Sequence, residues 1–357
     1  MDSHGGAPPR LAKAATLAYC MTVTTPPARI VEPIQPPRDQ PTTVHHVLQR
    51  VVEASRALDQ GAPADYIPEL AHADCELTSA AITRCDGTTI TAGDAATHRF
   101  TLQSSAKLVV LLGLLEERGP DAVFEVVGRE PSLGGFASLA NLDRARPANP
   151  LINAGAIALC GQLQGPLEQR LAWLEGWVRR CYGEALHVNQ RVLASERRTG
   201  DRNRAIAYLL RQTGVFADRV DEVLETYFAL CSFEATVVEA SRLPALLAAG
   251  GVRPSGERIL SRTTAGATVS LMATCGMYDE SGAYLLEAGL PAKSGVSGVI
   301  VAVAPGRAGI AVASPRLNHK GGSVRGHYVL RRLSSELGWH FAHAGEPPQP
   351  EPPGADA

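Results

Sequence analysis

Ser104 and Lys107 are the two residues of this sequence whose types and spacing are best suited to chemistry. They stand three positions apart, and an apolar run follows at residues 108–115. On a helix, that spacing places both side chains on one face. A serine hydroxyl needs a base within hydrogen-bond reach to become a nucleophile. A lysine buried by such a run can lose its proton and act as that base, so the pair predicts nucleophilic catalysis.

Lysine is scarce in this chain, which favours that interpretation. Lysine and arginine together number 34, but the only lysines are Lys13, Lys107, Lys293 and Lys320. Arginine stays charged in a protein, whereas lysine can act as a base. Lys293 opens a second candidate motif, Lys293-Ser294-Gly295, and would lower the pKa of Lys107 by like-charge repulsion if the two lie close. The plainer alternative is two ordinary lysines near helix or strand ends.

The composition is that of a globular protein with little net charge. The 357 residues are 45% hydrophobic and the formal net charge is −2, so no electrostatic argument favours nucleic acid as a partner. The seven cysteines are scattered without a Cys-x-x-Cys pair, and the ten histidines form no His-x-x-x-His pattern. This argues against a zinc site or a disulfide framework and for a reducing compartment.

The start of the chain needs separate consideration. Arg10 and Lys13 precede a short apolar stretch at residues 14–23, which imitates a secretory signal. Bulky Tyr19 stands where a lipoprotein cleavage box would have a small residue, so we favour a disordered extension or a misassigned start over export. No apolar run reaches the roughly 20 residues that a membrane span needs. We therefore expect a cytoplasmic protein with no membrane partner.

The hydrophobic pattern divides the chain into three parts. Residues 1–44, rich in Pro, Thr and Ala, and the Pro/Glu-rich residues 344–357 predict disordered ends around one folded domain at 45–343. Short apolar runs predict strands at 77–82, 88–91, 284–288, 298–304 and 309–313. Helical periodicity predicts a helix that begins at Ser104 and others at 47–58, 167–182, 203–213, 220–231, 237–249, 265–275 and 323–337, with a break or kink at Pro244.

Strands near both ends with helices between them predict an α+β fold. An antiparallel sheet built from N- and C-terminal segments would carry a helical part inserted at about residues 104–280. Ser104 would then lie at the seam between the two parts, where a pocket is expected.

Several ordered motifs in the sequence identify a family. Ser104-x-x-Lys107 with Lys293-Ser294-Gly295 resembles serine β-lactamases and penicillin-binding proteins, which implies a β-lactamase/transpeptidase-like fold. Other motifs, in family order over about residues 46–342, resemble one relative of that superfamily, the glutaminase family. They are Ala64-Asp65-Tyr66-Ile67-Pro68-Glu69-Leu70, Asn149-Pro150-x-x-Asn153, Ser195-Glu196-x-x-x-Gly200-Asp201-Arg202-Asn203, Tyr227-Phe228-x-x-Cys231-Ser232, Cys275-Gly276-Met277-Tyr278-Asp279 and Gly289-Leu290-Pro291-Ala292-Lys293-Ser294-Gly295-Val296.

The resemblance implies hydrolysis of L-glutamine to L-glutamate and ammonia, with no metal or cofactor, by a homodimer or homotetramer. Ser104 would attack the side-chain amide to give a γ-glutamyl ester, with Lys107 as general base. The backbone N–H groups of Ser104 and Val296 would form the oxyanion hole. Tyr227 and Tyr278 would bind substrate and relay protons to the leaving ammonia.

The resemblance also implies that Tyr66, Asn153, Glu196 and Asn203 hold the amino-acid end of glutamine. A carboxylate suits the ammonium group, while amides and a hydroxyl suit the carboxylate. Plainer explanations stay open. The acid and the two amides could be helix-capping groups, Tyr66 could be a loop anchor, and Tyr227 a buried tyrosine bonded to the backbone.

The sequence departs from the family pattern at four positions, none of them a matched catalytic residue. Leu133 and Ala137 replace the usual glycine of Glu-Pro-Ser-Gly and the asparagine of Phe-Asn-Ser. Val299 and Gly322 replace the second glycine of Gly-Gly-Ile and the asparagine of Gly-Asn-Ser. These changes bear on loop positions, affinity and substrate choice.

Two rival functions are weighed against a glutaminase. A related serine amidase or β-lactam-interacting enzyme would use Ser104 and Lys107 on another substrate, but it would have no reason for Glu196. A non-catalytic glutamine-binding module would not need an intact Ser104, Lys107, Tyr227 and Tyr278.

Overall fold

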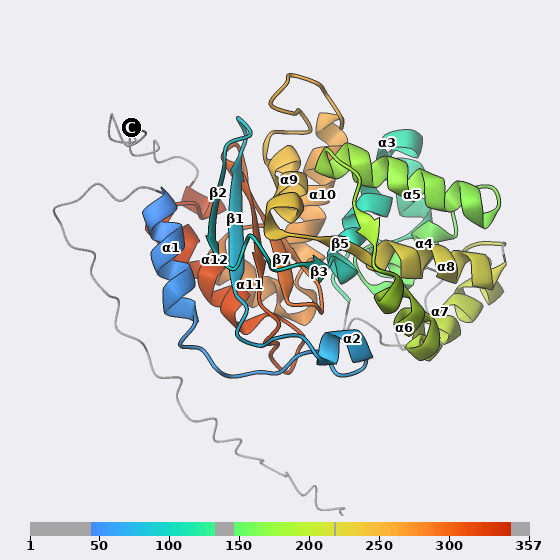
Figure 1. Ribbon diagram of the computed structural model, residues 1–357. Helices are drawn as coiled ribbons and strands as arrows, with labels where there is room; N and C mark the ends of the chain where they lie inside the picture. The colour runs from blue at the N-terminus through green and yellow to red at the C-terminus, as the bar shows by residue number, and fades with distance from the viewer. Residues whose placement is uncertain (1–43, 133–145, 218, 344–357) are drawn as a thin grey trace, which may run out of the picture. The chain divides into compact units, whose positions relative to one another are not determined.

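The computed structural model describes residues 44–132, 146–217 and 219–343, which belong to one compact unit (Figure 1). Its main sheet is antiparallel, in the strand order β2-β1-β8-β7-β6. The central pairing joins β1 to β8, with Ser79 opposite Ala313 and Arg84 opposite Ala308. Segments from both ends of the chain therefore build one sheet, which confirms the predicted α+β fold. The strands are β1 (Ser79–Arg84), β2 (Thr89–Gly93), β6 (Ala292–Ser294), β7 (Val299–Ala304) and β8 (Ala308–Ala313).

Successive side chains of a strand point to opposite faces of the sheet. Both faces of this sheet are buried, each in its own core. On β1, Ala80 and Ile82 pack into one core and Ala81 into another. The first core lies under α1 (Val44–Ser55), α11 (Ser281–Ala288) and α12 (Val324–Leu337). The second lies under α9 (Val237–Ala248), which packs on β1, β7 and β8 from the opposite side (Figure 1).

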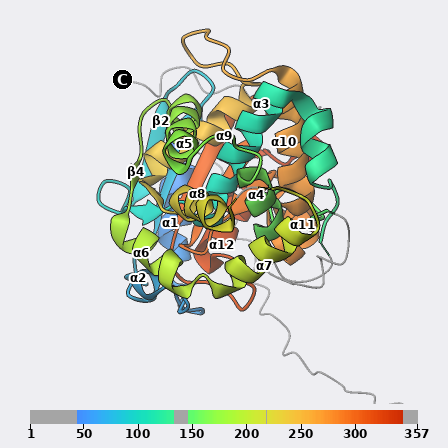
Figure 2. The same ribbon diagram turned by 90° about the vertical axis from the view of Figure 1, so that its right-hand side faces the viewer.

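The helical part is organised around α3 and α8. Every residue of α3 from Lys107 to Leu115 is buried, and α8 contacts α4, α5, α6 and α7 at the centre of Figure 2. A small sheet, β3-β5-β4, joins this part to the rest. The helical part and this small sheet comprise β3 (Phe100–Thr101), η1 (Gln103–Ala106), α3 (Lys107–Val126), α4 (Asn153–Cys160), α5 (Leu167–Tyr182), β4 (His187–Val188), α6 (Gln190–Thr199), α7 (Asp201–Gln212), α8 (Val220–Cys231), β5 (Phe233–Ala235) and α10 (Arg262–Cys275).

Three short elements lie outside these layers. They are α2 (Pro68–Ala71), η3 (Tyr278–Glu280) and η4 (Phe341–His343). Sequence periodicity did not reveal α2, η3 or the two- and three-residue strands β3 to β6, because such short elements carry too few residues to show a period. It also missed the ten-residue helix α6, whose buried face includes the polar residues Ser195 and Glu196.

The predicted strand at residues 284–288 is wrong, because these residues belong to α11. Ser281, Tyr284 and Ala288 are buried, whereas Leu286 is 81% exposed. Burial at positions i, i+3 and i+7 is the pattern of one helix face. The short apolar run was ambiguous because it is compatible with a buried strand and with one side of a helix.

Of the break or kink predicted at Pro244, the break is wrong, since α9 runs without interruption from Val237 to Ala248. Its packing on three strands outweighs the one backbone hydrogen bond that proline removes. The helix irregularity lies elsewhere, at Gly119 of α3, which has φ 78° and ψ 165° ahead of Pro120. The predicted disordered ends, apart from Val44, and the departures at Leu133 and Ala137 lie outside the described residues.

Candidate active site

Ser104 lies in η1, the single 3-10 turn that connects β3 to α3. The chain enters this turn through Leu102, whose N–H donates to the carbonyl of Phe233 in β5 at 2.7 Å. Gln103 has φ 47°, a left-handed conformation that residues other than glycine rarely adopt. In a 3-10 helix, residues i and i+3 are eclipsed. Ser104 and Lys107 therefore share one side, as predicted, although the turn is 3-10 and not α-helical.

Lys107, the first residue of α3, is fully buried. Its Nζ donates to Oδ1 of Asn153 at 2.6 Å and to the carbonyl of Leu151 at 3.4 Å. Burial lowers the pKa of Lys107 to about 8, against the opposing effects of the Cys231 thiol and the Glu196 carboxylate. A lysine with this pKa is partly neutral near pH 8 and can accept a proton.

Lys293 is a second fully buried lysine, in the middle of β6. Its Nζ donates to the carbonyl of Ser294 at 2.6 Å and lies 4.0 Å from the ring centroid of Tyr278. Burial, followed by repulsion from Lys107, lowers the pKa of Lys293 well below its ordinary value. Two buried lysine amines that repel one another favour a state in which at least one of them is neutral.

Tyr227 and Tyr278 flank the amine of Lys107. Their ring centroids lie 6.0 Å and 5.9 Å from Nζ. Burial raises the pKa of both hydroxyls. A hydrogen bond with the Ser104 hydroxyl acts in the opposite direction on the pKa of Tyr278. Cys231 lies one turn after Tyr227 in α8 and hydrogen-bonds the Tyr227 hydroxyl. Both tyrosines are thus neutral groups that can donate or pass on a proton.

The turn between β6 and β7 brings Val296 to the serine. A Cβ on Gly295 would lie 2.7 Å from the carbonyl oxygen of Leu102 and 3.3 Å from Cβ of Gln103, so only glycine allows this close approach. Val296 follows Gly295 and Ser104 follows Gln103, so the backbone N–H groups of Val296 and Ser104 lie at this close approach. Two backbone donors beside a serine hydroxyl are the groups that an oxyanion hole requires.

A carboxylate and two amides lie next to this cluster. Glu196 of α6 is only 7% exposed, and burial raises its pKa to about 7, although a hydrogen bond from Gln103 and the charge of Lys107 oppose that rise. Nδ2 of Asn153 donates to Oδ1 of Asn203 at 3.0 Å. The site residues contributed by α4, α6 and α7 therefore converge on the turn that carries Ser104.

The capping explanations for these residues do not fit the structure. Asn153 is the first residue of α4, follows the N-cap residue Ile152, and makes no capping hydrogen bond. Asn189, and not Glu196, caps α6, while α7 begins after Gly200 without a side-chain cap.

Tyr66 precedes α2 and reaches the cluster with its hydroxyl. Almost half of its surface (49%) is exposed. Desolvation nevertheless raises the pKa of the hydroxyl, and the charges of Glu196 and Tyr278 raise it further. The polar end of Tyr66 therefore lies toward Glu196 while part of the residue faces solvent, which differs from an exposed loop anchor.

Sequence reasoning did not name Gln103 and Cys231 as site residues. Gln103 donates to Oγ1 of Thr101 at 3.2 Å and hydrogen-bonds Glu196, while its strained backbone precedes Ser104. Its position beside the nucleophile was the only available signal. Cys231 stands four residues after Tyr227 in α8, a spacing that places both side chains on one helix face.

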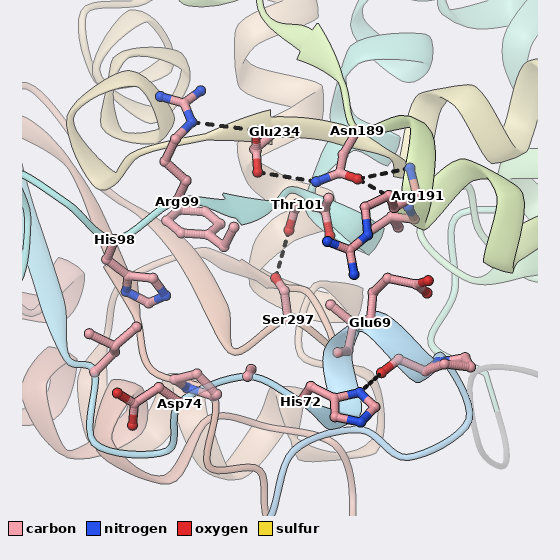
Figure 3. Close-up of a pocket in the computed structure, with 17 residues that line it drawn as sticks. Glu69, His72, Asp74, His98, Arg99, Thr101, Asn189, Arg191, Glu234 and Ser297 are labelled. Carbon is pink, nitrogen blue, oxygen red and sulfur yellow. Dashed lines mark hydrogen bonds and ion pairs between the residues drawn. The ribbon is translucent and has the colours of Figure 1, made fainter.

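A cavity of about 470 Å³ lies beside this cluster (Figure 3). Figure 3 shows Glu69, His72 and Arg191 around it, and Ser297 on its wall donates to the carbonyl of Thr101 at 2.6 Å. None of the nine residues expected to act in catalysis or substrate binding lines the cavity. The buried, interacting titratable groups mark the site better than the cavity volume does.

The described residues contain no group of His, Cys, Asp or Glu that could hold a metal ion. Their six cysteines are free thiols. No helix in the described ranges is long and apolar enough to cross a membrane.

Comparison with known proteins gives a consistent result. A family model described as Glutaminase matches residues 61–341. A glutaminase of Legionella pneumophila (strain Corby) is 48% identical over 299 residues, which cover 83% of this chain and 96% of the relative.

Two solved structures are similar over most of their length. Mglu in its glutamate form has a TM-score of 0.78 at 39% identity, covering 82% of this chain and 68% of Mglu. A probable glutaminase from Bacillus subtilis, complexed with 6-diazo-5-oxo-L-norleucine, has a TM-score of 0.76 at 30% identity. The match covers 86% of this chain and 98% of that glutaminase.

Proposed function

This chain belongs to the glutaminase family, and we propose that it hydrolyses the side-chain amide of L-glutamine to L-glutamate and ammonia. One observation carries the proposal. The turn with Ser104 contacts a buried carboxylate, Glu196, through Gln103. Lys107, directly after the turn, bonds Asn153, which in turn bonds Asn203. A serine with a nearby base and a receptor for a zwitterion thus occupy one place, which suits an amino acid with a reactive side-chain amide.

In the first half of the proposed reaction, Oγ of Ser104 attacks the amide carbon while neutral Lys107 takes its proton. The N–H groups of Ser104 and Val296 donate to the oxygen that becomes negative. The C–N bond then breaks and ammonia leaves with a proton passed through Tyr227 or Tyr278. The product of this step is a γ-glutamyl ester on Ser104.

In the second half, water attacks the ester carbon and gives up a proton to the same base. The C–O bond to Ser104 breaks, the hydroxyl regains its proton, and L-glutamate leaves. Every step uses protein groups and water, so we propose that no metal or cofactor takes part.

Glu196 is proposed to bind the substrate ammonium group. With a pKa of about 7, its carboxyl is partly protonated in the free protein, and an approaching cation favours the charged form. Asn153, Asn203 and the hydroxyl of Tyr66 are proposed to donate to the substrate carboxylate. These charge-assisted hydrogen bonds would be the main determinants of selection for an amino acid.

We also propose that residues 45–343 are the catalytic domain, with the helical part inserted at about 104–280, and that the enzyme is a homodimer or homotetramer in the cytoplasm. Analytical ultracentrifugation of the purified chain tests the oligomeric state. A monomer at all concentrations would contradict it.

The test of function is ammonia release from L-glutamine by the purified chain, compared with Ser104→Ala. A matched control is Ser270→Ala, because the exposed Ser270 hydroxyl on α10 bonds only the carbonyl of Gly266. We expect turnover in the wild type and the control and none in Ser104→Ala. L-asparagine and a chromogenic β-lactam serve as comparison substrates, and activity on them alone would place the enzyme elsewhere in the superfamily.

If the folded wild type turns over none of the three substrates but binds glutamine in calorimetry, the protein is a binding module instead. The ester is tested with hydroxylamine, which intercepts a γ-glutamyl ester as a hydroxamate. We expect γ-glutamyl hydroxamate to form with the wild type and not with Ser104→Ala.

A further inference from the structure

The short helix η3 carries Tyr278 in an unfavourable backbone conformation. Tyr278 has φ 55°, and among the described residues only Gln103 shares a positive φ without being glycine. Such a conformation persists where the surroundings hold it in place. On one side Ser281 does so, because its Oγ accepts from the N–H of Met277 at 3.0 Å and donates to the carbonyl of Tyr278 at 2.8 Å.

The other side of η3 is held through Glu280. Its Oε1 accepts a hydrogen bond from Nδ2 of Asn318 at 2.8 Å, and its Oε2 lies 4.0 Å from Nε2 of His327 in α12. The carboxylate side chain is only 18% exposed. Lys320 adds an ion pair of 3.4 Å to Asp279, the residue between Tyr278 and Glu280.

Asn318 is itself fixed within its loop. Its Oδ1 accepts from the N–H groups of Lys320 at 2.9 Å and Gly322 at 3.0 Å. Its own N–H donates to the carbonyl of Gly322 at 2.8 Å. The donor that meets Glu280 is therefore held by both backbone and side-chain bonds, so it can act as a fixed anchor.

Gly322 leaves the room that Glu280 and His327 occupy. A Cβ at this position would lie 2.6 Å from Oε2 of Glu280, 2.8 Å from Nε2 of His327 and 3.3 Å from Nδ2 of Asn318. Gly322 is also the position at which this sequence departs from the usual Gly-Asn-Ser. The departure is thus coupled to the placement of an acidic side chain two residues after Tyr278.

We propose that Glu280 is a positioning residue for Tyr278, which it fixes by tying η3 to Asn318, with Gly322 leaving the space that Glu280 and the neighbouring His327 occupy. This rests on the proposed role of Tyr278 in glutamine hydrolysis. Glu280 does not touch the reacting atoms. It keeps the Tyr278 ring over Lys293 and its hydroxyl at Ser104, so its loss slows turnover more than it weakens substrate binding.

The experiment measures kcat and KM for L-glutamine together with hydrogen–deuterium exchange at residues 277–281. Glu280→Ala is expected to lower kcat roughly tenfold, the effect of one lost hydrogen bond to a charged group, with KM little changed and faster exchange at 277–281. Glu280→Gln keeps an oxygen acceptor for Asn318 and is expected to retain kcat within about threefold. The melting temperature should stay near that of the wild type in both.

Glu287→Ala is the matched control. Glu287 is an exposed residue of α11 that bonds Arg331 of α12 at 3.3 Å. We expect wild-type kcat and exchange for it.

Gly322→Ala should push the ends of Glu280 and His327 aside and reproduce part of the Glu280→Ala effect. The double variant should then be no slower than Glu280→Ala alone, because both changes act on one contact.

The proposal is overturned if Glu280→Ala leaves both kcat and exchange unchanged in an active enzyme, or if Gly322→Ala and Glu280→Ala are additive. Exchange is independent of activity. A wild type that does not hydrolyse glutamine, with faster exchange in Glu280→Ala, would remove the proposed function and leave the positioning contact intact.

Discussion

The amine of Lys107 donates a 2.6 Å hydrogen bond to Oδ1 of Asn153. The other end of the same amide, Nδ2, donates to Oδ1 of Asn203 at 3.0 Å. Asn153 therefore connects the proposed base to the proposed receptor for the substrate carboxylate. Nδ2 carries two hydrogens, so it has a second donor for a substrate carboxylate while Oδ1 keeps its bond to the lysine amine. Substrate binding and base alignment thus share one side chain.

Replacement of Lys107 tests the base. Lys107→Arg is expected to lower kcat by about 10²- to 10⁴-fold, the usual contribution of a general base, because arginine cannot release its proton. Ammonia release and thermal melting should be measured together. Since arginine is larger than the lysine it replaces at a fully buried position, Lys107→Met serves as a second variant. Substantial turnover by folded Lys107→Arg would remove lysine from this role.

Asn153→Asp tests the connection between the base and the receptor. A carboxylate at 2.6 Å from Nζ raises the pKa of Lys107 above its value of about 8, because an opposite charge favours the protonated amine. The rising limb of the pH profile of kcat should therefore move to higher pH. Asn203→Asp, one amide further from Lys107, is the control and should move that limb less. Equal shifts in both variants would argue against a direct connection.

Glu196 should control the pH dependence of substrate affinity. Burial raises its pKa to about 7, so the carboxyl is neutral below that pH and charged above it. KM for glutamine should therefore rise as pH falls through 7. Glu196→Gln should raise KM about 10- to 100-fold, the loss of a hydrogen bond to a charged group, and should remove this pH effect.

The control for that variant is Glu225→Gln, because Glu225 pairs with Arg197 at 2.6 Å and has no proposed contact with substrate. An unchanged KM profile in Glu196→Gln would show that another group binds the ammonium end.

Arg325 should be a major determinant of stability. It is 1% exposed, and its guanidinium donates to the carbonyls of Arg56, Leu58, Cys75 and Glu76 and to Oγ1 of Thr78. Arg325→Met leaves these partly buried acceptors without their donor, so the free energy of unfolding should fall by about 1–3 kcal/mol.

Urea unfolding of Arg325→Met beside Arg331→Met measures this loss. Arg331 is exposed and pairs with Glu287 at 3.3 Å, so its replacement should cost less than about 1 kcal/mol. Similar costs for the two variants would contradict the assigned role of Arg325.

Much of the architecture could be predicted from local patterns. The predicted helix at 167–182 matches α5, and the helix at 220–231 matches α8, because long amphipathic segments bury one face whatever their partner. The run at 284–288 failed because eight residues of α11 carry too little periodic signal to exclude a strand. The predicted break at Pro244 does not occur because packing of α9 on the sheet outweighs the tendency of proline to end a helix.

The sequence by itself determined the family, the fold class and the identities of nine candidate site residues, since ordered motifs and residue types are properties of the chain. Only the tertiary structure decided what those residues do to one another. Burial sets the pKa of Lys107 at about 8 and that of Glu196 at about 7, and burial together with the charge of Lys107 lowers the pKa of Lys293. These effects depend on desolvation and on distances between residues far apart in the chain. For the same reason, the sequence exposed Gly322 as a departure, and only the structure linked it to Glu280.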